Sequence, residues 1–222
     1  MTSPATRTYN ARRGRMGSGR VDATVRLLPR FALPGGPLDR EAVFGRHAPV
    51  VLEIGSGMGE ATVAMAAADP GRDYIGVEVY TAGLANLLRL VETAGLANVR
   101  THHGDAIALL RDRLEPASLD AIHVFFPDPW PKMRHRKRRL IETARVSLLV
   151  GRLRPGGVLH CATDDAEYAA DMLAVLVATP GLGNVHSGFA PRPAYRPDTR
   201  YELRGRRAGR PSRDLVFRRL PA

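Results

Sequence analysis

The stretch "PVVLEIGSGMGEATVAMAAAD", residues 49–69, joins two different patterns through a glycine-rich link. Its first part is a short apolar run, which predicts a buried strand, and "EATVAMAAAD" predicts a helix. The glycines between them let the backbone turn tightly and approach a ligand that a side chain would keep away. A strand, a glycine loop and a helix in this order indicate an α/β sheet with a binding site at the loop.

The same alternation continues along the chain. Four more apolar strands are predicted at 73–79, 97–106 (including its loop), 118–126 and 155–163. Helical segments follow them at 81–95, 107–115, 137–153 and 166–179. Continuous apolar strands that alternate with amphipathic helices predict a mostly parallel sheet with helices on both faces.

The pattern changes after Gly183. Short candidate strands separated by turns follow as "VHSGFA" (185–190), "TRYELRG" (199–205) and "RDLVFRR" (213–219). Strands that are linked by short turns pair antiparallel. We therefore expect antiparallel strands to close one edge of the sheet.

The positive charge of the chain is localised. The net charge of 222 residues is +11, and the arginines and lysines concentrate in 1–20, 132–139 and 192–222, while the rest is mildly acidic. Localised cations attract polyanions, above all nucleic acid. The length predicts one domain at 21–222, preceded by a flexible basic segment at 1–20.

Other function classes are disfavoured by composition. Cys161 is the single cysteine, which excludes an internal disulfide framework and suits the reducing cytoplasm. The sequence contains no run of about eighteen apolar residues, so no membrane span is expected. No histidine or cysteine pair has the spacing of a metal site, so no metal is expected.

Acids end the predicted strands at the edge where ligands of parallel sheets bind. Glu53 precedes the loop that contains Gly55 and Gly57, Glu78 ends the second strand, and Asp105 follows the third. A carboxylate at Glu78 can accept both ribose hydroxyls of a nucleoside, and Asp105 can reach an adenine amino group. The set looks like the S-adenosylmethionine site of Rossmann-like methyltransferases. The alternative is that Glu53 is a cap and the other two are solvated loop acids.

The fourth strand runs into "FPDPWPKMRHRKRR", residues 126–139. Pro127 and Pro129 restrict the backbone around Asp128, so the position of its carboxylate is largely preset. Preorganised charge of this kind stabilises transition states, although a proline-rich turn with a surface acid gives the same pattern. Trp130 suits either base stacking or packing, and the cations after it suit either phosphate binding or a solvated face.

Together, "EIGSGMGE", "FPDPWPKMRHRKRRL", "ATDDAEYA" and "DTRYELRGRRAG" resemble the bacterial tRNA (guanine-N7-)-methyltransferase family. The resemblance extends from "RTYNARRGRM" to "DLVFRR", nearly the whole chain. It implies a Rossmann-like fold with a mostly parallel seven-stranded sheet. It also implies methyl transfer from S-adenosylmethionine to guanine N7 in tRNA, typically at position 46 of the variable loop.

The resemblance implies roles for individual residues. The cofactor contacts would be Glu53, Gly55, Gly57, Glu78, Asp105 and Asp128, and Asp128 would also be the catalytic acid. The substrate contacts would be Lys132, Asp164, Thr199, Arg200, Tyr201 and Glu202. Met133 and Arg136 stand where further basic residues are common in the family, which would soften the affinity for tRNA.

Rival functions remain open from the sequence. One is a Rossmann-like methyltransferase that acts on another RNA or on a small acceptor, and another is an RNA-binding protein with a decayed cofactor fold. A nicotinamide-dependent oxidoreductase is disfavoured because the loop is GxGxG and not GxGxxG. The sequence fits a monomer or a homodimer.

Overall fold

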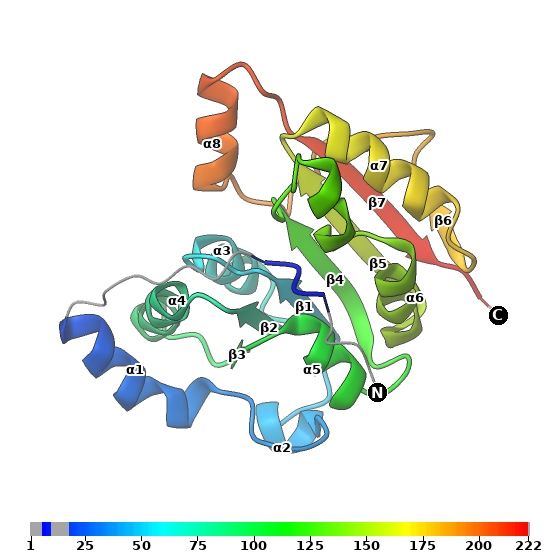
Figure 1. Ribbon diagram of the computed structural model, residues 1–222. Helices are drawn as coiled ribbons and strands as arrows, with labels where there is room; N and C mark the ends of the chain where they lie inside the picture. The colour runs from blue at the N-terminus through cyan, green and yellow to red at the C-terminus, as the bar shows by residue number, and fades with distance from the viewer. Residues whose placement is uncertain (1–5, 10–17, 222) are drawn as a thin grey trace.

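The computed structural model describes residues 6–9 and 18–221, and it places seven strands in one sheet (Figure 1). The strands are β1 Val50–Ile54, β2 Asp73–Glu78, β3 Val99–His103, β4 Leu119–Phe125, β5 Leu153–Thr163, β6 Leu182–Asn184 and β7 Arg213–Arg219. Their order is β3-β2-β1-β4-β5-β7-β6. Strands β1 to β5 pair in parallel, whereas β7 is antiparallel to both β5 and β6. The predicted parallel sheet with an antiparallel edge is confirmed.

Helices cover both faces of the sheet (Figure 1). They are α1 Ser18–Phe31, α2 Arg40–Phe44, α3 Glu60–Ala68, α4 Thr81–Thr93, α5 Ala106–Asp112, α6 Thr143–Arg152, α7 Ala166–Val177 and α8 Arg200–Arg207, with a 3-10 helix η1 at Met133–Arg138. The cores of the two faces are separate. One contains α5, α6 and α7, and the other contains α1, α3 and α4.

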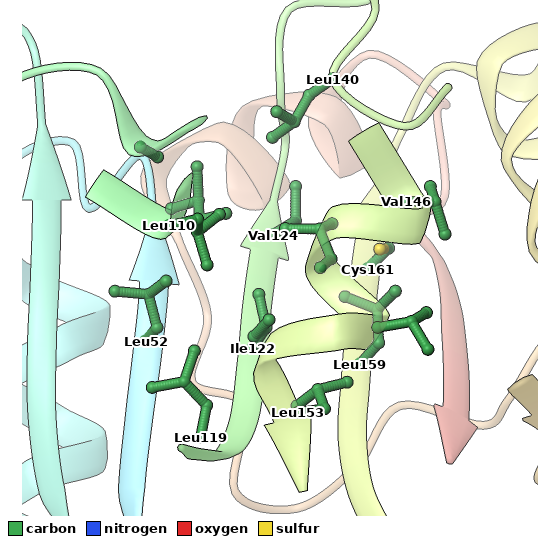
Figure 2. Packing of buried hydrophobic residues seen from close by; sticks show 14 of the residues in the cluster. Leu52, Leu110, Leu119, Ile122, Val124, Leu140, Val146, Leu153, Leu159 and Cys161 are labelled. Carbon is green, nitrogen blue, oxygen red and sulfur yellow. The ribbon is translucent and has the colours of Figure 1, made fainter. Parts of the chain in front are cut away.

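Neighbouring strand residues enter different cores, as expected from the alternation of side chains along a strand. Leu52 packs in the first core and Val51 in the second, and both are essentially unexposed. Figure 2 shows the first core, where Leu110 and Val146 lie against strand residues. Because both faces are buried, the central strands are mostly apolar, as in the run Val50, Val51 and Leu52 of β1.

Cys161 lies in the first core on β5. Its side chain is fully buried, and burial raises the pKa of the thiol. The residue is therefore a packing residue, not a nucleophile.

Three local expectations are wrong. Residues 185–190 form turns that end in an isolated bridge at Ala190, and 199–205 lie in a helix rather than a strand. The helix expected to start at 137 begins at Thr143, because Leu140 and Ile141 are buried in the core before it. The flexible segment predicted at 1–20 stays a prediction: α1 begins at Ser18, and residues 1–5 and 10–17 lie outside the described residues.

Candidate active site

A cavity of about 250 Å³ lies at the carboxyl ends of β1, β2 and β4. The chain order reverses between β1 and β4, since β2 and β3 lie on one side of this pair and β5 on the other. Ligands of open α/β sheets bind at such a switch point. Of the residues singled out in the sequence, those that line the cavity are Glu53, Gly55, Gly57, Glu78, Asp128, Thr199, Arg200 and Tyr201.

The loop after β1 forms one wall, and its shape depends on glycine. Gly55 and Gly57 have φ values of 81° and 58°, which side chains rarely adopt. The first turn of α4 also packs directly on this loop. A Cβ atom added to Gly83 would lie 2.2 Å from the carbonyl oxygen of Gly57. The loop is therefore fixed both by its own glycines and by a glycine on the neighbouring helix.

Glu78 joins this loop to the end of β2. Its Oε2 accepts a hydrogen bond from the Gly57 N–H at 2.6 Å, and its Oε1 accepts from Val79 N and Tyr80 N, each at 2.7 Å. The carboxylate is thus held at the cavity wall by three backbone donors. Oε2 accepts only one of these three bonds and keeps a second lone pair, so the group can still accept from a ligand hydroxyl.

Glu53 lies deeper, at the end of β1. Its side chain is buried and accepts a hydrogen bond from the Thr62 hydroxyl on α3. Burial raises the pKa of Glu53 to about 7, and the hydrogen bond from Thr62 opposes part of that rise. The group can therefore change its charge near neutral pH, and a cationic ligand would favour its ionised form.

Asp128 lines the cavity between two residues with unusual backbones. Phe126 and Trp130 have φ values of 53° and 45°, in the left-handed region that non-glycine residues rarely adopt. Such strain persists only where surrounding contacts enforce it, and it concentrates at functional sites. The backbone is thus strained on both sides of Asp128, which is consistent with the preset position expected for its carboxylate.

Trp130 takes part in these enforcing contacts. Its side chain is buried, its indole N–H donates to the Thr8 carbonyl at 3.2 Å, and the Arg138 guanidinium lies 4.4 Å from the ring centroid. The packing interpretation of this tryptophan fits the structure. Thr8 and Tyr9 also line the cavity, a role that the sequence patterns did not indicate.

The basic run divides into two groups. Arg139 is buried and forms ion pairs with Glu167 and Asp171 on α7. Lys132, directly before η1, and Arg134 and Lys137 within it are exposed. The buried member docks the run on the domain, and the exposed members are available to an anion.

Four predicted site residues do not line the cavity. Asp105 caps α5 by accepting from Ile107 N at 2.7 Å, and Lys132 lies outside on the surface. Asp164 accepts from Arg210 Nε at 2.9 Å. Glu202 is buried in a network of ion pairs away from the cavity.

The comparisons with known proteins agree on one family. A family model described as "Putative methyltransferase" matches residues 47–215. A tRNA (guanine-N(7)-)-methyltransferase of Bordetella parapertussis is 48% identical over 215 residues, which cover 96% of this chain and 85% of the relative. A protein of the same name from Streptomyces avermitilis is 50% identical over 218 residues, or 96% and 75% of the two chains. This chain belongs to the tRNA (guanine-N(7)-)-methyltransferase family.

A solved structure of another methyltransferase has a fold similar to that of this family member. The crystal structure titled antibiotic-resistance methyltransferase Kmr superposes with a TM-score of 0.59 at 18% identity, covering 86% of this chain and 95% of that one. At that identity the likeness concerns the fold alone. It agrees with the Rossmann-like arrangement described above.

The cavity lining fits S-adenosylmethionine, the methyl donor that a methyltransferase family implies. The donor carries a sulfonium cation, an ammonium group and ribose hydroxyls, and Glu53, Glu78 and Asp128 are acceptors for such groups. Ser56 Oγ is buried on the lining without a hydrogen-bond partner in the described part of the chain. A Cβ atom at Gly55 would project into open space, so the loop leaves room for a ligand.

Within residues 6–9 and 18–221, no group of three or more histidine, cysteine, aspartate or glutamate side chains could hold a metal ion. In the same residues no helix has both the length and the apolar character needed to cross a bilayer.

Proposed function

We propose that the protein transfers the methyl group of S-adenosylmethionine to N7 of a guanosine in tRNA, at position 46 in the variable loop. The observation that carries the proposal is the meeting of Glu53, Glu78 and Asp128 in one cavity beside the exposed cations of η1. Among the described lining residues Arg200 is the only basic one, and it is paired with Glu60 at 2.7 Å. The cavity therefore suits a cationic nucleoside better than a pyrophosphate.

The bound cofactor would supply an electrophilic methyl group. Gly55 and Gly57 would let the backbone approach it, Glu78 would accept from its ribose hydroxyls, and Glu53 would compensate its positive charge. Asp105 would accept from the adenine amino group. Its cap hydrogen bonds to α5 use Oδ1 alone, so Oδ2 is the atom assigned to this contact.

Guanine N7 has a lone pair and loses no proton on methylation. The protein therefore needs no general base for the nucleophile; it needs to align N7 with the methyl carbon and to stabilise the positive charge that develops on the purine. Asp128 is assigned both tasks, because its carboxylate lies on the cavity wall at the end of β4. A fixed carboxylate costs no reorganisation when the charge develops.

The tRNA would approach from the side of η1 and α8. Lys132 and its exposed neighbours would contact phosphates, and Thr199, Arg200 and Tyr201 would meet the target nucleotide at the cavity. Asp164 and Glu202 are assigned to the substrate by resemblance alone. A tRNA substrate also implies a cytoplasmic enzyme, as a monomer or a homodimer.

Methylation of a bulk tRNA transcript with a labelled methyl donor, followed by nucleoside analysis, tests this function. We expect label in 7-methylguanosine and its loss when G46 of a single tRNA is replaced by adenosine. Label in another nucleoside, or in a small acceptor only, would support the rival methyltransferase reaction. Label in 7-methylguanosine that persists without G46 would refute the position and leave the reaction.

A further inference from the structure

The helix that closes one side of the cavity, α8, has no apolar face with which to pack. Within its sequence RYELRGRR, only Glu202 and Gly205 are buried, while Tyr201 and Leu203 are 53% and 41% exposed. Figure 1 shows α8 standing away from the helices that cover the sheet. Most helices in proteins are held by burial of an apolar face, so something else must position this one.

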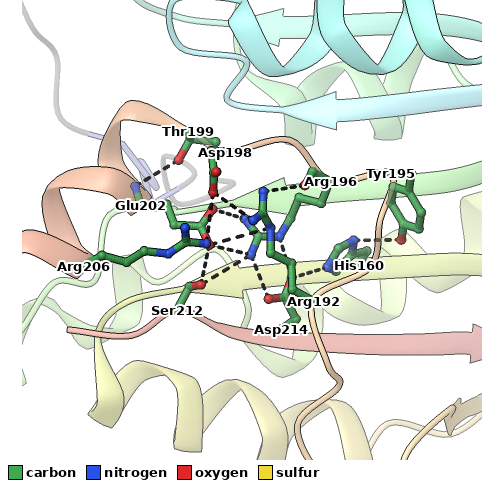
Figure 3. A network of polar contacts seen from close by, with 10 residues as sticks. All are labelled: His160, Arg192, Tyr195, Arg196, Asp198, Thr199, Glu202, Arg206, Ser212 and Asp214. Carbon is green, nitrogen blue, oxygen red and sulfur yellow. Dashed lines mark hydrogen bonds and ion pairs between the residues drawn. The ribbon is translucent and has the colours of Figure 1, made fainter. Parts of the chain in front are cut away.

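The attachment is a buried arginine from the loop before the helix (Figure 3). The Arg196 side chain is fully buried, and its Nη1 and Nη2 donate to the two carboxylate oxygens of Glu202 at 2.6 and 3.1 Å. Its Nε and Nη2 donate to the two oxygens of Asp214 on β7, at 2.6 and 2.8 Å. One guanidinium therefore binds both the first turn of α8 and the sheet, each through a bidentate contact.

The sheet side of this contact is itself braced. His160 on β5 contacts Asp214 Oδ1 through Nε2 at 2.7 Å, and the Tyr195 hydroxyl lies 2.8 Å from His160 Nδ1. Because the carboxylate accepts from Nε2, Nδ1 carries no proton in the neutral ring and accepts from the tyrosine. Tyr195 and Arg196, which are adjacent in sequence, are thus both tied to the same edge of the sheet.

The residues between Arg196 and Glu202 form the cavity wall. Thr199 caps α8 by accepting from Glu202 N at 3.1 Å, and Thr199, Arg200 and Tyr201 all line the cavity. Arg200 then reaches α3, where it pairs with Glu60. The position of this wall is consequently set by a contact that lies behind it and touches no ligand.

We propose that Arg196 is a positioning residue for methyl transfer: through Glu202 and Asp214 it fixes the wall formed by Thr199, Arg200 and Tyr201. The inference rests on the proposed function. It also gives Glu202 a role other than direct substrate contact. A buried ion pair adds little net stability compared with apolar packing, but paired bidentate contacts define an orientation.

The test is a double-mutant cycle with Arg196→Met and Tyr201→Ala, read as kcat/KM for tRNA in formation of 7-methylguanosine. We expect Arg196→Met to lower kcat/KM at least about 100-fold, because the wall loses its placement. Tyr201→Ala should lower it at least about tenfold in the wild type but less than about twofold in the Arg196→Met background. A purely structural arginine would leave the two effects independent, and their factors would multiply.

Arg46→Met is the matched control. Arg46 also pairs with a buried carboxylate, Asp73, at 2.7 Å. This pair lies at the start of β2, whereas the cavity lies at the carboxyl ends of the parallel strands. We expect this variant to melt earlier and to keep kcat/KM within about twofold of the wild type below its melting temperature. An equal loss of kcat/KM in Arg46→Met would overturn the assignment.

Further outcomes are equally decisive. If Arg196→Met does not fold, the same cycle is run with Glu202→Gln, which keeps the shape of the side chain and removes its charge. Independent effects in the folded pair refute the inference, as does a Tyr201→Ala that leaves wild-type kcat/KM unchanged. A wild-type enzyme that forms no 7-methylguanosine refutes the proposed function instead, and the inference falls with it.

Discussion

Replacing Glu53 by glutamine should remove a pH dependence from cofactor binding. Burial raises the pKa of Glu53 to about 7, so the free protein changes charge at this carboxyl near neutral pH. A cationic ligand favours the ionised form. If only that form binds, the ionised fraction rises from about 0.1 at pH 6 to about 0.9 at pH 8, and the apparent Kd tightens about tenfold.

Isothermal calorimetry with S-adenosylhomocysteine, which keeps the ammonium group, measures this effect. The wild type should show the tenfold change between pH 6 and pH 8 and should release about half a proton per ligand bound at pH 7, where about half of the free protein is already ionised. Glu53→Gln should show the same Kd at both values, because the amide does not titrate and can still accept from Thr62. A flat profile in the wild type, or an equal slope in the variant, would refute the reasoning.

The same pKa shift has a consequence for stability, with a defined sign. The folded state holds the proton of Glu53 up to about pH 7, whereas an unfolded glutamate loses it near its ordinary pKa of 4.5. The Glu53 contribution to the free energy of unfolding therefore falls by about 3 kcal/mol from pH 4.5 to pH 7 and is level above that. Urea titrations of wild type and Glu53→Gln across this range check the difference.

Four other substitutions separate binding, chemistry and folding. Asp128→Ala should lower kcat at least about 100-fold while the fold persists; a folded variant with full turnover would remove Asp128 from the mechanism. Lys137→Ala should reduce the slope of log Kd for tRNA against log salt by about 1, whereas Arg139→Ala should lower the free energy of unfolding by about 2 kcal/mol and leave that slope unchanged. Equal slopes for Lys137→Ala and the wild type would show that the exposed side of η1 meets no phosphate. Gly83→Ala should destabilise the protein by about 2 kcal/mol and weaken cofactor binding, because its Cβ would collide with the Gly57 carbonyl; calorimetry and melting curves would contradict this if both were unchanged.

The sheet could be predicted because its determinants are local. Each central strand is an apolar run such as Val50–Ile54, and each is followed by a segment with helical periodicity. The error at 199–205 arose because Tyr201 and Leu203 alternate with polar residues, which favours a strand. Both side chains are in fact exposed, and the Thr199-x-x-Glu202 spacing, a helix-start signal, was the better guide.

The residues of the site also divide into those that the sequence could predict and those that it could not. Glu53, Glu78 and Asp128 could be placed together because they end parallel strands of known polarity. Arg196 could not be found, since its partners lie six and eighteen residues away and only the tertiary structure brings them together. The sequence shows that a segment is basic, but it does not show which arginine in that segment is buried.

Among the described strands β7 comes last along the chain, yet it lies between β5 and β6. A nascent chain therefore carries β1, β2 and the glycine loop long before the ribosome has released the strand that holds Asp214. Until then β6 has no neighbour in the sheet, and Arg196 lacks one of its two carboxylates. The wall formed by Thr199, Arg200 and Tyr201 is therefore anchored to the sheet only after β7 has left the ribosome, and a chain that is terminated before Asp214 would lack that anchor.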